Sequence, residues 1–207
     1  MNPNAFHKLS YGLYVLSSSF EGKPSGCIIN TVMQVTSTPA QISVTVNKDN
    51  YTEKTIAQSG CFAAVALTQD VSMDLIGEFG FKTSETTDKF KNFAVAQDGN
   101  GIPYLIQNAA ARFSCKVVQQ MDVGTHVIFV GEVTEAEVLS DSKVMTYSYY
   151  HTIKKGTTPK NAPTYQAETA NAAGYRCPVC GYVVEGELPA DFVCPICGQP
   201  AKTFIRI

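Results

Sequence analysis

The chain contains 207 residues, 44% of them hydrophobic and 16% charged, and its net charge is −2. These values allow one medium-sized domain and a small one, each with a packed core. No run of Lys and Arg is present, which excludes the electrostatic footprint of a nucleic-acid-binding protein. No apolar run reaches the roughly 18–20 residues that cross a bilayer, and the N-terminal segment lacks the profile of a secretory signal. We therefore expect a cytoplasmic protein without membrane contact.

Strand-like segments separated by turn residues dominate the first 150 residues or so. Four segments rich in Val, Ile, Phe and Thr are predicted to be strands, at 41–46, 62–67, 111–118 and 125–139. Helices are predicted at 51–60 and 71–80, where apolar side chains of the second recur on one face and Gly80 can end it. Many strands with few helices favour a mainly β fold, a barrel rather than a doubly wound sheet.

A change in composition divides the chain. Residues 154–174 consist mostly of Thr, Pro, Asn, Ala and Gly without an apolar period, which is typical of a linker. We expect a domain at 1–153, a linker at 154–174 and a small module at 175–207.

The small module holds four of the seven cysteines in two matched pairs, CPVCG and CPICG. The paired residues are Cys177, Cys180, Cys194 and Cys197. A two-residue gap lets both sulfurs of a pair face one point, and four thiolates around one ion indicate tetrahedral zinc or iron. The ligands alone do not decide between the two metals. The remaining cysteines are expected to be small buried hydrophobic residues: Cys27, Cys61 and Cys115.

The surroundings of the pairs resemble a rubredoxin. The matching positions are Tyr175, Tyr182, Leu188, Pro189, Asp191, Phe192 and Phe204. The 13-residue gap between the pairs is shorter than in free-standing rubredoxins and is similar to the trimmed module of rubrerythrins, and Phe192 stands where Trp is usual. The resemblance implies iron. A closed four-thiolate iron site has no open position for a substrate but can pass one electron.

The N-terminal domain lacks both the G-x-G-x-x-G and the Walker A patterns, and GNG at 99–101 is a turn. Polar residues of the segment 26–48, including Asn30 and Thr31, suit the polar edge of a ring. Lys48 and Thr52 stand at a predicted helix start, where free N–H groups favour a phosphate. Simple capping of the helix by Asn50 or Thr52 is the alternative interpretation.

Four segments of this domain together resemble the flavin reductase-like family, which binds FMN in a split β-barrel. They are YGLYVLSSSFEGKPSGCIINTVMQVTSTPAQISVTVNKDNYT at 11–52, TTDKFKNF at 86–93, GTHVIFVGEVTEAEV at 124–138 and YYHTIKKGTTPKNAPTY at 149–165. The resemblance implies that the isoalloxazine edge meets Asn30, Thr31 and Val32. It implies further that the ribityl chain and phosphate contact Asn47, Lys48, Tyr51 and Thr52, and that Ser84 and Lys89 complete the phosphate site. Glu85 and Thr86 depart from the Gly and basic residue that often follow Ser in this family.

His126 admits two interpretations. On a strand it shares one face with Ile128 and Val130, so it can be a core histidine with a satisfied hydrogen bond. The family pattern instead implies a catalytic place near the flavin or the nicotinamide.

The two parts together resemble the high-molecular-weight rubredoxins of anaerobic bacteria. The resemblance implies a homodimeric electron-transfer flavoprotein in which NAD(P)H reduces FMN, FMN reduces the iron, and the iron reduces a redox partner such as a flavodiiron oxygen or nitric oxide reductase. A flavin is needed because nicotinamides give up two electrons as hydride, whereas the iron accepts one.

Two other functions remain open from the sequence. The chain can be a flavin reductase that supplies reduced FMN to another enzyme, with a structural zinc module. It can also be a non-enzymatic barrel, with or without FMN, that grips a protein partner through a zinc ribbon. Bound flavin and the identity of the metal distinguish the three.

Overall fold

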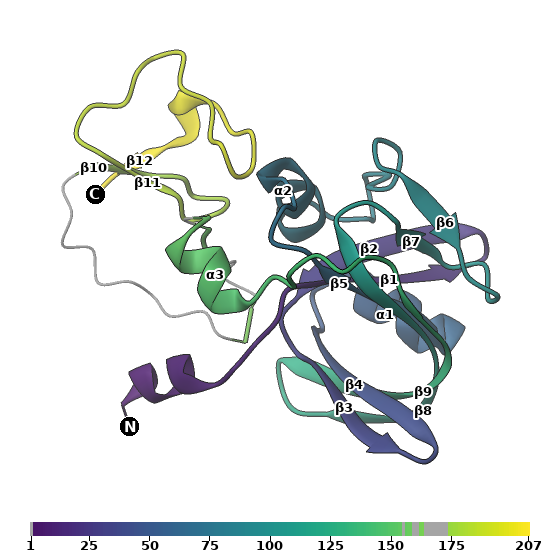
Figure 1. Ribbon diagram of the computed structural model, residues 1–207. Helices are drawn as coiled ribbons and strands as arrows, with labels where there is room; N and C mark the ends of the chain where they lie inside the picture. The colour runs from purple at the N-terminus through teal and green to yellow at the C-terminus, as the bar shows by residue number, and fades with distance from the viewer. Residues whose placement is uncertain (1, 155, 159–161, 164–173) are drawn as a thin grey trace.

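A computed structural model of the chain describes residues 2–154, 156–158, 162–163 and 174–207 (Figure 1). In chain order its elements are η1 (Pro3–Lys8), β1 (Tyr14–Phe20), β2 (Lys23–Ile29), β3 (Val32–Ser37), β4 (Ala40–Asn47), α1 (Tyr51–Ser59), β5 (Cys61–Leu67), α2 (Met73–Phe81), β6 (Val95–Gln97), β7 (Pro103–Leu105), β8 (Ala109–Asp122), β9 (His126–Val138), α3 (Tyr147–Thr152), β10 (Gly174–Arg176), β11 (Val183–Glu185), η2 (Ala201–Thr203) and β12 (Ile205–Arg206).

The N-terminal domain is built on a seven-stranded antiparallel sheet in the order β2-β1-β5-β8-β9-β4-β3. The two long strands β8 and β9 pair with two register shifts, which bend the sheet and increase its twist. The fully buried Leu16, Val44, Phe62 and Phe129 fill its interior. The mainly β fold predicted from the sequence is confirmed.

The predicted elements correspond to β4, β5, β8, β9, α1 and α2. The expected start of α2 at residue 71 was wrong, because the Ser72 side chain accepts a hydrogen bond from Leu75 N (3.2 Å) and caps the helix. The helix also continues to Phe81, one residue beyond the Gly80 expected to end it. The short helix α3 was not predicted, because its Tyr-rich sequence lacks an apolar period.

A second apolar cluster attaches α2 and α3 to the outside of the sheet. Leu75, Ile76 and Phe79 of α2 pack in it together with Phe90 and Tyr150. Phe79 and Phe90 meet edge to face, with ring centroids 5.1 Å apart. The barrel and the two helices thus form one continuous body.

The four cysteines belong to a small C-terminal module with the sheet order β11-β10-β12. Figure 1 shows this module beside α2 and α3, and Met73 and Phe81 of α2 pack against its core. The predicted linker, residues 154–174, lies largely outside the described residues; Lys154, residues 156–158 and 162–163, and Gly174 are described. None of the helices in the described ranges is long and apolar enough to cross a membrane.

Candidate flavin pocket and metal centre

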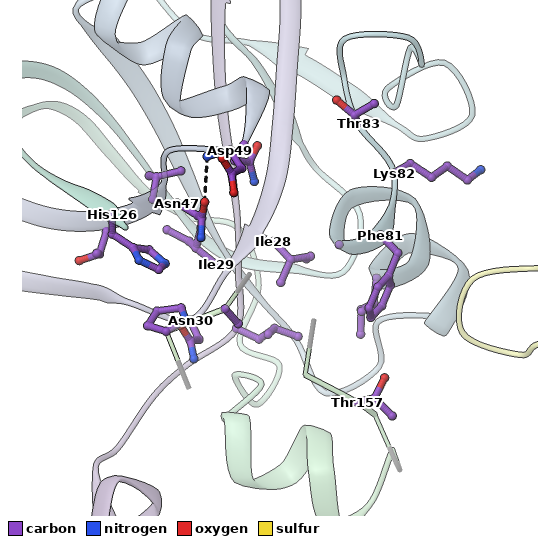
Figure 2. A pocket seen from close by; sticks show the side chains of 18 of the residues that line it. Ile28, Ile29, Asn30, Asn47, Asp49, Phe81, Lys82, Thr83, His126 and Thr157 are labelled. Carbon is purple, nitrogen blue, oxygen red and sulfur yellow. Dashed lines mark hydrogen bonds between the residues drawn. The ribbon is translucent and has the colours of Figure 1, made fainter. Parts of the chain in front are cut away.

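A cavity of about 500 Å³ opens where β2, β4 and β9 meet the start of α1 and the end of α2 (Figure 2). Apolar side chains such as Ile28, Ile29 and Phe81 form much of its wall. Amides, hydroxyls and an imidazole are interspersed with them. A largely apolar cleft with a few convergent polar groups is the usual form of a site for a flat aromatic ligand.

Strand pairing brings three of the predicted site residues together. Asn47 ends β4 and His126 begins β9, and the two are direct partners in the antiparallel ladder. Asn30 directly follows β2, and Figure 2 shows its side chain facing the same cavity as Asn47 and His126. Asn30 and Asn47 are 17 positions apart in the sequence, and Asn47 and His126 are 79 positions apart. The pairing of the strands therefore brings the three residues together.

The start of α1 contributes Asp49, Asn50 and Tyr51 to the cavity wall. Asn50 is the N-cap, and its side chain accepts a hydrogen bond from Thr52 N (3.0 Å). Asn50 therefore caps α1, as the alternative interpretation predicted, and the backbone N–H of Thr52 is engaged by this cap. The Thr52 side chain is fully buried.

Lys48 lies on a second cavity of about 420 Å³, which shares Asn47, Asp49 and His126 with the first. Its Nζ pairs with Asp122 Oδ2 at 2.6 Å. The hydrogen bond from Lys48 holds the pKa of Asp122 below its usual value. Lys48 thus forms an ion pair with Asp122 at the outer end of the site.

Thr31 and Val32 support the site from behind. Thr31 Oγ1 donates to Thr45 O (3.1 Å), and Thr45 itself faces the cavity. Val32 packs on the barrel core. Among the described residues, neither Thr31 nor Val32 lines one of the two cavities.

Ser84 and Lys89, predicted to complete a phosphate site, are bonded elsewhere. Ser84 Oγ accepts from Gly26 N (3.0 Å) and donates to Gly26 O (3.2 Å). Lys89 is buried, and its Nζ donates to Gly26 O (2.8 Å) and Phe79 O (3.2 Å). Burial lowers the pKa of Lys89 to about 8. Lys89 therefore links the last turn of α2 to β2. The C-terminal end of a helix, with its free carbonyl groups, is a favourable place for a cation.

Lys82 and Thr83, immediately after α2, do line the first cavity. The sequence analysis missed them, although a Lys and a Thr directly after a helix were a readable signal. It also missed Tyr147, Tyr150, Thr157 and Val179, which line the cavity as well. Tyr150 and Thr157 lie in the family-like segment 149–165, but no local pattern shows that α3 and the metal module reach the cavity, because both do so only through tertiary packing.

His126 is nearly buried at the junction of the two cavities. Its Nδ1 forms a hydrogen bond with Thr125 Oγ1 (2.8 Å). This contact fixes the orientation of the ring on the wall that also carries Asn47.

The four sulfurs of Cys177, Cys180, Cys194 and Cys197 lie within 4.8 Å of one another. Both pairs have the same backbone pattern, with Gly181 N donating to Cys177 O and Gly198 N to Cys194 O (both 2.9 Å). Each of these glycines has a positive φ, 82° and 72°, as the tight loops require.

The pKa values of the metal-centre thiols also indicate a site for a cation. Burial and the neighbouring Cys194 raise the pKa of Cys180, because four thiolates this close repel one another. Burial acts in the same direction on Cys177, but backbone N–H groups of Cys180 and Val179 bring its pKa below the usual value. A bound metal ion displaces the remaining protons, so the residues present suit a tetrahedral metal.

The other cysteines take no part in this centre. Cys27 and Cys115 are buried as predicted, whereas Cys61 is only partly buried. Burial raises the pKa of Cys115 to about 12 and also raises that of Cys27. These two thiols are therefore poor nucleophiles at neutral pH.

Comparison with known proteins assigns a family to each of the two parts of the chain. Residues 6–157 match the family described as "Flavin reductase like domain", and residues 175–205 match "Rubrerythrin, rubredoxin-like domain". The chain is 45% identical over 165 residues to a ferric-chelate reductase (NAD(P)H) of Archaeoglobus fulgidus, covering 80% of this chain and 98% of that protein. It is 40% identical over 191 residues to a high molecular weight rubredoxin of Moorella thermoacetica, covering 89% of this chain and 83% of that protein.

The fold of the N-terminal domain is also found in solved structures. The Streptomyces globisporus NADH:FAD oxidoreductase SgcE6 superimposes with a TM-score of 0.62 and 21% identity, covering 69% of this chain and 84% of that one. At this level of identity, the comparison supports a shared fold for the N-terminal domain and nothing further.

Proposed function

The chain belongs to the flavin reductase-like family and ends in a rubredoxin-like domain, and on this basis we propose that it passes electrons from NAD(P)H through FMN to a four-cysteine iron and on to a redox partner. It is an oxidoreductase, and the pairing of the two domains indicates electron transfer through a flavin. One observation carries the finer proposal: Val179, inside the first cysteine loop, lines the cavity that holds Asn30, Asn47 and His126. The domain boundaries proposed for this arrangement are 1–153 and 175–207, with a linker at 154–174.

FMN would supply hydride acceptance and delivery of single electrons. In the proposed site, Asn30, Thr31 and Val32 meet the edge of the isoalloxazine ring, partly through their backbone. The ribityl chain and phosphate contact Asn47 at the end of β4, Lys48, and Tyr51 and Thr52 at the start of α1. The family resemblance adds Ser84 and Lys89; the hydrogen bonds of both side chains to Gly26 support a structural role instead.

His126 is proposed to orient the nicotinamide against the flavin. We expect His126→Asn to slow flavin reduction by NADH about ten-fold, because a misplaced reactant loses its near-attack geometry. The bound flavin should remain at wild-type occupancy. Single-turnover absorbance at the flavin band measures this rate.

Thr125→Ser provides the matched control for His126. It keeps the hydroxyl that bonds His126 Nδ1, so its rate should stay within about two-fold of the wild type. A wild-type rate in His126→Asn would show that the imidazole has no part in the reaction.

The redox partner is proposed to be a protein such as a flavodiiron oxygen or nitric oxide reductase, and the chain is proposed to form a homodimer with FMN at the subunit seam. The partner needs access to the iron, and the half-buried Cys197 supports such access. Residues 166–207 carry three basic and four acidic side chains, which is compatible with transient docking.

The visible absorption spectrum of the purified protein, with metal analysis of the same sample, tests the proposal. We expect thiolate-to-iron bands over a flavin spectrum, and both should bleach with NAD(P)H. Zinc at full occupancy after anaerobic expression with iron supplied would refute the relay. That result would favour the second candidate function, a flavin reductase with a structural zinc module. The match of the ferric-chelate reductase over 98% of its own length supports a working flavin domain without the relay.

A further inference from the structure

The two cysteine loops of the metal module are built alike but have different surroundings. Cys177 N donates to Tyr182 O and Cys194 N to Gln199 O, both at 2.8 Å and with the same spacing. By this internal symmetry, Cys180 and Cys197 are equivalent positions. Yet Cys180 is only 2% exposed, whereas Cys197 is half-buried. The difference must come from what covers each loop.

The first loop is held by a short strap, Gly156 and Thr157, which follows α3 at the start of the segment predicted to be the linker. Thr157 Oγ1 donates a hydrogen bond to Cys180 O. Thr157 is itself anchored, because its carbonyl accepts from Tyr150 Oη (3.1 Å). Gly156 sits so close to the Tyr150 ring that an added Cβ would overlap it. His151 Nδ1 lies 2.9 Å from Gly156 O. The strap thus connects α3 rigidly to the backbone of a metal ligand.

The second loop rests on α2. A Cβ added at Gly77 would overlap the backbone carbonyl oxygen of Ile196, so the loop touches the helix where no side chain intervenes. Ile196 is 4% exposed and shares a cluster with Met73 and Phe81 of α2. Lys89 fixes the end of the same helix. The module is therefore seated at two points.

This seating turns the first loop toward the flavin cavity. Val179 lines the cavity beside Thr157 and Phe81. The carbonyl of its neighbour Cys180 accepts the hydrogen bond from Thr157. Cys197 lies on the other loop and is the one partly exposed residue among the four cysteines.

We propose that the metal module works docked on its own chain, with Gly77 as the docking residue, so that the iron receives electrons through the Cys180 loop and delivers them through Cys197. This inference rests on the proposed function. Each transfer removes one electron from the reduced flavin and converts one Fe(III) to Fe(II), with no bond formed or broken. Two transfers, with the iron reoxidised by the partner between them, remove the two electrons of the hydride that NAD(P)H supplies, and its proton is released to solvent.

The test compares Gly77→Ala with Gly80→Ala. Both changes remove a glycine from α2 and raise helix propensity by about 1 kcal/mol. An added Cβ at Gly80 meets Ile28 Cγ1 at 3.6 Å, an ordinary contact. The Gly77 Cβ instead has to push away a backbone carbonyl. A difference in amide exchange between the two variants is therefore due to the contact with Ile196 and not to the change in helix propensity.

Hydrogen–deuterium exchange on the zinc-loaded protein measures docking without any redox step. In Gly77→Ala we expect amides of Met73–Phe81 and of residues 194–198 to exchange faster than in the wild type and in Gly80→Ala. Unchanged exchange in Gly77→Ala would overturn the docking contact. A wild-type protein that lacks iron, or whose iron stays oxidised, would instead refute the proposed function while leaving this measurement intact.

Rapid kinetics on the iron-loaded protein measure the consequence. Gly77→Ala should keep its flavin reduction rate but slow the following iron reduction by at least about ten-fold, because small displacements of reacting centres are costly. Oxidation of the chemically reduced iron by cytochrome c should stay within about two-fold, because cytochrome c reaches the module from solvent and does not depend on the contact of the module with α2. Gly80 also lines the first cavity, so the kinetic test rests on Gly77→Ala alone. Equal slowing of iron reduction and of iron oxidation in this variant would overturn the assignment.

A photo-reactive methionine analogue tests whether the module serves its own chain. After subunit exchange between ¹⁵N-labelled and unlabelled chains, cross-links from Met73 to the module should join peptides of the same label. Links between unlike labels at the statistical frequency would overturn docking within one chain.

Discussion

Replacing Cys194 by Ser should abolish iron-dependent electron delivery and leave the flavin chemistry intact. A tetrahedral site of four thiolates loses most of its affinity for the metal when one ligand is removed, and folding of so small a module depends on the metal. We expect the thiolate-to-iron absorption to disappear and cytochrome c reduction by NADH to fall about 100-fold or more, because no one-electron carrier remains after the flavin. Absorbance spectra and steady-state kinetics measure both effects.

Cys61→Ser is the matched control for this change. Cys61 is a partly buried cysteine at the start of β5, outside the metal centre. Its replacement should alter neither the metal content nor the rate of cytochrome c reduction by more than about two-fold. In Cys194→Ser, flavin reduction by NADH should proceed at the wild-type rate. Full electron delivery by a metal-free Cys194→Ser protein would remove the iron from the reaction path.

Replacing Lys89 by Met should abolish a pH dependence of stability that the wild type shows between about pH 8 and pH 10.5. Burial lowers the pKa of Lys89 from 10.5 to about 8 in the folded state. Between these values the unfolded chain binds more protons than the folded one, so the unfolding free energy rises with pH. A shift of this size corresponds to about 3 kcal/mol, all of it gained above pH 8. Chemical denaturation at a series of pH values measures the rise.

Lys91→Met is the control for Lys89→Met, because Lys91 lies two residues away and is exposed. This variant should keep the full rise in stability. Lys89→Met should also bind FMN within about two-fold of the wild type, because its Nζ is engaged by the carbonyls of Gly26 and Phe79. A large loss of FMN affinity with an unchanged pH profile would instead place Lys89 at the phosphate, as the family resemblance implies.

The sequence by itself determined the features that depend on local pattern. Alternation of apolar residues specified β4, and segments rich in Val, Ile, Phe, Ala and Thr specified β5, β8 and β9. The spacing of Cys177, Cys180, Cys194 and Cys197 specified the metal centre, because each pair forms within a single loop. The family motifs also identified Asn30, Asn47, Tyr51 and His126, the four predicted residues that line the first cavity.

Only the tertiary structure decided which neighbours these groups have. Lys89 and Lys82 read alike in the sequence, yet packing sends Lys89 to two buried carbonyls and leaves Lys82 at the cavity. The two cysteine loops also read alike, yet one faces the flavin cavity and the other rests on Gly77. Contacts between residues far apart in the chain depend on how rigid elements pack, and a local pattern of residue types carries no record of that packing.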